Sequence, residues 1–147
     1  MKMFITASVA LAAASLAFSV SAEEWSSVSS SARVVYLADL SSIATAGNDT
    51  TIKVARIPLP ATAGDYTHKI NEYAFRCAAN QARIVLEVEY GSSGAEEARY
   101  PDPEAEWDRP SANSLGAYIK SIACDNQRST APSSPSIKAF IDSQQGG

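Results

Sequence analysis

Alternating apolar and polar side chains predict β-strands through the middle of the chain. The run 33–38 is rich in β-branched and aromatic residues, and we expect it to end at Asp39. The run 51–57 alternates as a half-buried strand does, with Ile52 and Val54 on one face, until two prolines prevent its continuation. The pattern therefore predicts two strands in this part of the chain.

Two further runs follow, and the short turn between them predicts an antiparallel hairpin. In the run 67–77 the apolar face carries Tyr73, Phe75 and Cys77. In the run 83–90 four apolar side chains are expected to share one face: Ile84, Leu86, Val88 and Tyr90. Cys77 is thus expected on the apolar side of a strand.

Helical periodicity appears only after these strands. From Ser111, which can cap a helix, apolar residues recur at helical spacing: Leu115, Tyr118, Ile119 and Ile122. At about 100° per residue, Cys124 lies about 180° from this stripe, so we expect the helix to end or distort near Ala123. Strands followed by a helix predict an α+β fold, with the helix packed on one face of an antiparallel sheet.

The C-terminal segment is rich in serine and proline. Residues 129–136 are expected to be a linker, and the apolar residues after it to form a short amphipathic turn: Ile137, Phe140 and Ile141. We therefore expect one domain over 23–128 and a loosely attached tail over 129–147.

Residues 1–22 have the pattern of a secretory signal peptide. Lys2 precedes a stretch of apolar and small residues, and Ala22 stands before two acidic residues. We expect cleavage between Ala22 and Glu23. A retained membrane anchor is the alternative, but the apolar run is short of the roughly 18–20 residues that span a bilayer. No cysteine near Ala22 offers a site for a lipid anchor, so we expect an exported protein, periplasmic or secreted, without a membrane anchor.

The charge balance argues against nucleic acid as a partner. Loss of Lys2 with the signal peptide leaves 11 basic and 16 acidic side chains, a net charge of −5. Phosphate backbones are bound by clustered Lys and Arg, which this composition does not favour. The remaining 125 residues are enough for one domain with a modest core.

Cys77 and Cys124 are the two cysteines of the chain. In an oxidising compartment we expect them to form a disulfide. Closing a loop of almost fifty residues stabilises a fold by about 4 kcal/mol in the chain-entropy model. Two reduced thiols, or a bridge between molecules, are the alternatives.

Few residues are suited to catalysis. His68 is the only histidine, so we expect neither a His-based triad nor a multi-histidine metal site, and beside Lys69 it is interpreted as solvated. The serines within 91–94 are typical of a turn and do not fit a nucleophile elbow. Glu87 and Glu89 are expected about 7 Å apart on one strand face, a separation that suits a glycosidase. The pair is better interpreted as the solvent side of an amphipathic strand. We expect no catalytic residue and no enzymatic activity.

Acidic side chains are concentrated after the predicted hairpin: Glu96, Glu97, Asp102, Glu104, Glu106 and Asp108. They could collect calcium, but their spacing is not that of a known calcium loop, and a solvated connection is the simpler interpretation. We expect no metal and no cofactor. The proline-rich stretch 101–110 is expected to be an exposed, irregular connection that holds one buried or half-buried tryptophan. Tryptophan also suits a binding surface, but we expect Trp25 and Trp107 to fill the core.

Several short features, taken in order, resemble the surface-adhesin protein E-like domain of bacterial envelopes. The resemblance covers nearly all of the span from Trp25 to Cys124. The matching features are Trp25, the segments 36–43, 53–56 and 72–77, and Trp107 followed by Pro110, Ser111, a helix and Cys124.

This resemblance implies an antiparallel sheet of about six strands with a C-terminal helix tethered to it by the cysteine pair. It also implies a binding or adhesive role outside the cytoplasm, and it is consistent with a homodimer. We therefore expect a non-enzymatic exported binding module with a protein partner, adhering to an extracellular or envelope macromolecule. The alternative is a periplasmic structural or assembly protein that self-associates or docks on envelope proteins.

Overall fold

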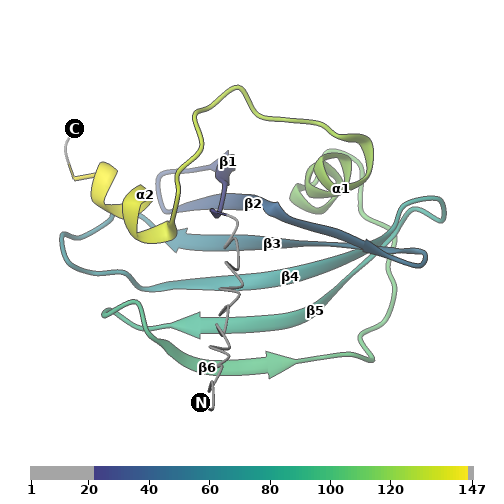
Figure 1. Ribbon diagram of the computed structural model, residues 1–147, viewed down its shortest axis with the longest axis horizontal. Helices are drawn as coiled ribbons and strands as arrows, with labels where there is room; N and C mark the ends of the chain where they lie inside the picture. Colours follow the sequence, from purple (N-terminus) through teal and green to yellow (C-terminus); the bar gives the residue numbers. More distant parts are fainter. Residues whose placement is uncertain (1–21, 146–147) are drawn as a thin grey trace, which may run out of the picture.

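A single six-stranded antiparallel sheet and two helices make up the computed structural model, which describes residues 22–145 (Figure 1). The elements are β1 (Trp25–Ser30), β2 (Val34–Ala46), β3 (Asp49–Pro58), β4 (His68–Arg76), β5 (Gln81–Tyr90), β6 (Glu96–Pro101), α1 (Leu115–Asp125) and α2 (Ile137–Ser143). The strands lie in the sheet in chain order. The expected α+β fold is confirmed. The expected signal peptide, except Ala22, lies outside the described residues.

Each face of the sheet carries its own apolar cluster, because side chains alternate along a strand. On one face α1 buries Ile119 and Ile122 against Ala38, Ile52 and Phe75. We call this the α1 face. The helix contacts β1, β3 and β4, and Figure 1 shows both helices toward the β1 side of the sheet.

The opposite face, which we call the α2 face, is covered at one end by the C-terminal segment. There α2 buries Ile137 and Ile141 against Leu37 and Ile57. Residues Ser134 and Trp25 also exchange two backbone hydrogen bonds, of 2.9 and 2.8 Å. The expectation of a loosely attached tail is therefore wrong for the described part of this segment, because its isoleucines complete a core cluster.

Asp39 does not end its strand. Its side chain is 4% exposed, and Oδ1 accepts hydrogen bonds from the backbone N–H groups of Glu24 and Ser41, both at 3.0 Å. Because the carboxylate is satisfied in this way, β2 continues past it with a register shift between Asp39 and Ala44.

A register shift also divides the apolar face predicted for the run 83–90. Ile84 pairs with Tyr73 and Leu86 pairs with Glu72, so one extra residue on β5 lies between them. Ile84 therefore lies on the α1 face and Leu86 on the α2 face, against the expectation that they share one. Tyr73, Phe75 and Cys77 share the α1 face as expected.

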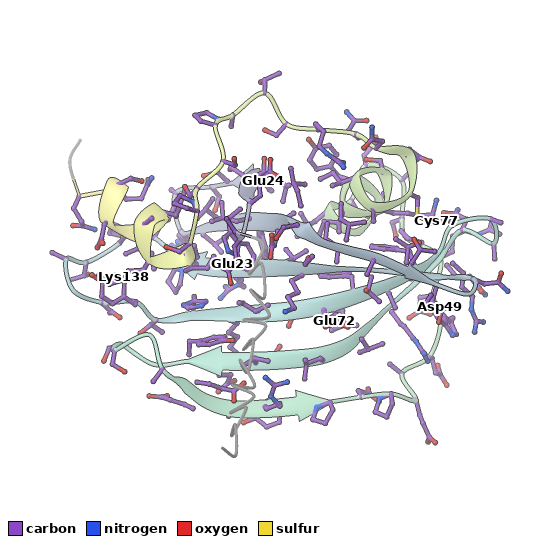
Figure 2. All side chains as sticks on the ribbon, viewed as in Figure 1. Glu23, Glu24, Asp49, Glu72, Cys77 and Lys138 are labelled. Carbon is purple, nitrogen blue, oxygen red and sulfur yellow. A yellow bond between two sulfur atoms is a disulfide. The ribbon has the colours of Figure 1, made fainter. Side chains whose placement is uncertain are left out.

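The Cys77–Cys124 disulfide joins the sheet to α1, as expected, with the two Cα atoms 5.7 Å apart. Helix α1 begins after Ser114, whose side chain accepts from Ala117 N–H at 3.1 Å, so Ser114 and not Ser111 is the cap. The helix ends at Asp125, two residues after Ala123, with Asn126 in the left-handed conformation as its C-cap. It needs no distortion because Cys77 lies in the turn after β4, beside α1 (Figure 2).

Candidate functional site

Two adjoining pockets on the α2 face form the groove that we take as the candidate site. They have volumes of about 250 and 180 Å³ and share four lining residues: Glu23, Trp25, Ile70 and Tyr90. The first pocket extends to Tyr66, His68 and Lys138 beside α2, and the second to Lys53, Glu72, Leu86, Val88 and Arg99. We call the whole the α2-face groove.

Strand pairing explains the floor of this groove. Ile70 pairs with Val88, and Glu72 pairs with Leu86, so alternate residues of β4 and β5 present one surface. Arg99 of β6 pairs with Val88 and extends this surface toward the sheet edge. In Figure 2 the labelled Lys138, Glu23 and Glu72 follow one another from α2 toward the middle of the sheet.

His68 and Tyr90 form the aromatic end of the groove. Their rings are stacked, with centroids 4.4 Å apart and planes inclined by 4°. His68 Nδ1 lies 2.6 Å from the carbonyl oxygen of Tyr66, so Nδ1 donates a hydrogen bond and Nε2 is left as an acceptor. The interpretation of His68 as solvated is wrong, since it is 7% exposed and burial lowers its pKa. At neutral pH the ring is uncharged.

Trp25 lines both pockets. The residue is 2% exposed, as expected for a core tryptophan, and its Nε1 donates to a carboxylate oxygen of Glu23 at 2.7 Å. At the α2 end, Lys138 Nζ lies 4.7 Å from the centre of the Tyr66 ring. The hydrogen bond to Tyr66 and the charge of Asp142 raise the pKa of Lys138, which stays cationic. The groove thus combines an apolar floor with side chains of both charges.

The groove geometry supports binding better than acid–base chemistry. Ser93 lines the same pocket as His68, but its hydroxyl accepts from Ala95 N–H at 3.3 Å, and no hydrogen bond among residues 22–145 joins it to His68. Glu87 and Glu89 lie outside the groove, where both contact Lys69 Nζ, at 3.2 and 2.9 Å. The carboxylate pair considered for a glycosidase is therefore held by an ion-pair partner.

Trp107 does not lie in the core. It is half-buried, and the guanidinium groups of Arg76 and Arg83 lie over its ring, at 4.2 and 4.3 Å from the ring centre. In the described part of the chain, no group of three or more His, Cys, Asp or Glu side chains is placed to hold a metal ion. No helix among the described residues is both long and apolar enough to cross a membrane.

The groove could be predicted from the sequence only in part. Alternation in the run 83–90 places Leu86, Val88 and Tyr90 on one surface, but nothing local indicates that Ile70 and Lys138 join them. Lys138 comes from α2, whose packing depends on the whole α2-face cluster.

Comparison with known proteins assigns this chain to a family. The model of the family described as surface-adhesin protein E matches residues 25–125, more than half of the 147 residues. The chain belongs to the surface-adhesin protein E family. No curated protein and no solved structure matches it.

Membership in the surface-adhesin protein E family implies export and a role of the surface-adhesin class, and the family is typically non-enzymatic. The match includes all six strands and α1 but ends before α2. One wall of the α2-face groove therefore lies outside the part that this chain shares with the family.

Proposed function

We propose that this protein is an exported, non-enzymatic module that adheres to an extracellular or envelope protein through the α2-face groove. The observation that carries the proposal is the groove itself, which places Tyr66, Tyr90 and Arg99 around an aliphatic floor. Tyrosine, tryptophan and arginine are enriched where proteins bind one another, and a polar rim with both charges favours a specific partner. Family membership supports the adhesive role.

Charge reversal at the rim tests the use of this surface. In one variant Lys53→Glu, Arg99→Glu and Lys138→Glu are combined, since all three are exposed and line the groove. The matched control reverses three exposed arginines outside the groove: Arg33→Glu, Arg56→Glu and Arg109→Glu. Binding to a panel of immobilised extracellular-matrix proteins is measured by biolayer interferometry. We expect affinity for the bound matrix protein to fall about tenfold in the groove variant and much less in the control.

Localisation provides a second test. If the protein is an adhesin, an antibody should label it on intact cells. A protein found only in the periplasm would contradict direct adhesion and would favour the structural or assembly role.

That second candidate, self-association or docking on envelope proteins, is supported by the open outer edge of β6. The strand is last in the sheet, so one side of its backbone has no partner strand among the described residues. A homodimer that pairs two copies of β6 predicts amide protection over residues 96–101 that increases with protein concentration. Hydrogen exchange at two concentrations tests this, and equal protection at both would contradict pairing through β6.

A further inference from the structure

A third pocket lies on the α1 face, over β5 and beyond the strands that α1 contacts. Its volume is about 420 Å³, and its apolar floor consists of Tyr73, Ala82 and Ile84. Ile84 is 39% exposed, one of two large apolar side chains that are exposed in the described part of the chain. The register shift in β5 places Ile84 here, since it pairs with Tyr73 of the α1 face. An apolar side chain that is exposed in this way can contact a partner.

The segment that follows β6 forms the wall of this pocket. Hydrogen bonds attach this segment to the part of β5 that does not pair with β6. Asp102 N–H donates to Val85 O at 2.7 Å. Ala82 and Asp108 exchange two backbone hydrogen bonds, of 2.7 and 2.9 Å. Arg83 Nη1 also donates to Ala105 O at 3.1 Å. The wall is therefore preorganised, which lowers the entropic cost of binding.

Trp107 determines which way the carboxylates of this segment point. Its ring is in contact with the guanidinium groups of Arg76 and Arg83, whose pairing partners place them on the α2 face. Because neighbouring residues of an extended segment point to opposite faces, Glu106 and Asp108 lie on the α1 face, where both line the pocket.

The rim of the pocket is rich in carboxylates, with Asp102, Glu106 and Asp108 beside a single basic side chain, Arg83. Of the ion pairs among residues 22–145, none includes Asp102, Glu106 or Asp108. The Arg83 guanidinium is already engaged, since it lies over the Trp107 ring and donates to Ala105 O. The segment 96–108 holds six acidic residues and one basic residue, whereas the rest of the chain holds 10 acidic and 11 basic. The chain's excess of negative charge is thus concentrated at this end of the sheet.

We propose that this pocket is a second binding site, for a basic polypeptide segment in which an aliphatic side chain is flanked by lysine or arginine. The aliphatic side chain contacts Ile84 and Tyr73, and the flanking cations face Asp102, Glu106 and Asp108. These carboxylates are spread along a sheet edge and form no group that could hold a metal ion among the described residues, so the complementary ligand is an extended polycation. The site is separate from the α2-face groove and does not depend on its role.

A labelled peptide with one leucine between two pairs of lysines, Lys-Lys-Leu-Lys-Lys, is the probe. Fluorescence anisotropy measures its affinity for the wild-type protein and for the Glu106→Gln, Asp108→Asn variant. Among residues 22–145 neither of these two carboxylates accepts a hydrogen bond. The matched control is Glu24→Gln, Asp65→Asn, which removes the same charge at two exposed positions outside the pocket. We expect affinity to fall roughly fivefold in the pocket variant and to stay within about twofold in the control.

The apolar part of the proposal is tested by replacing leucine in the peptide with serine. On the wild-type protein this change should weaken binding roughly fivefold, and on an Ile84→Ser variant it should have little further effect. Equal losses in the two charge variants, or equal affinity for the leucine and serine peptides, would show non-specific attraction to an acidic protein and would overturn the proposal. Because charged groups contribute to this interaction, added salt should also weaken the binding of the leucine peptide to the wild-type protein.

Discussion

Burial of His68 at the aromatic end of the groove makes the stability of this fold depend on pH. The folded protein holds the pKa of His68 below its ordinary value of 6.5, chiefly because the ring is buried. Below about pH 6.5 the unfolded chain therefore binds a proton at this residue that the folded chain does not bind. The free energy of unfolding should fall as the pH decreases from 7.5 to 5.5. Across this range most carboxylates stay ionised.

Urea denaturation at both pH values checks this expectation. In a His68→Gln variant, which has no titrating ring, we expect the difference between pH 7.5 and 5.5 to be largely lost. A wild-type stability that is constant or higher at pH 5.5 would contradict the neutral, buried imidazole.

Single residues also explain where sequence-based reasoning fails. Buried indoles are common, so the sequence favours the core for Trp107. The contacts that Arg76 and Arg83 make with its ring depend on a strand pairing that no local pattern specifies. Cys77 could be assigned correctly, because alternation alone places it beside Tyr73 and Phe75.

At the scale of elements, α2 is a structural part of the fold. Ile141 is 1% exposed within the α2-face cluster, so Ile141→Ala should lower the free energy of unfolding by about 2–4 kcal/mol. The control, Gln144→Ala, alters an exposed residue and should change it by less than about 0.5 kcal/mol. Denaturant melts of both variants make the comparison. Equal stabilities would mean that the tail is loosely attached after all.

The Cys77–Cys124 disulfide is the covalent connection between the sheet and α1. It joins residues 47 positions apart, and its removal in a Cys77→Ala, Cys124→Ala variant should lower the free energy of unfolding by about 4 kcal/mol. Reductant should destabilise the wild type similarly and leave the variant unaffected. A loss below about 1 kcal/mol would show that the packing of Ile119 and Ile122 alone holds the helix in place.

Elements with clear periodicity could be predicted, and the others could not. The alternating strands and the apolar stripe of α1 were evident in the chain. The serine-rich β1 and the acidic β6 carry little alternation, and they form strands because their neighbours supply backbone partners. A one-residue register shift, such as that in β5, has no local signature and yet moves Ile84 to the other face.

At the scale of the whole molecule, the sheet separates two surfaces with different chemistry. The α2 face offers a groove with aromatic side chains and both charges, and the far end of the α1 face offers an apolar pocket with an acidic rim. The family resemblance predicted the sheet and the tethered helix, but it could not indicate the whole α2-face groove, since α2 lies beyond the matched residues.

Adhesion through the α2 face is tested most directly by face-specific photo-crosslinking. Lys53 and Arg56 are both exposed on β3, and their odd spacing places them on opposite faces. A photoreactive p-benzoylphenylalanine is placed at one position or the other, and the protein is irradiated on the matrix protein that binds it. The account predicts crosslinks from position 53 and few from position 56. Crosslinks mainly from position 56, or equally from both, would contradict it.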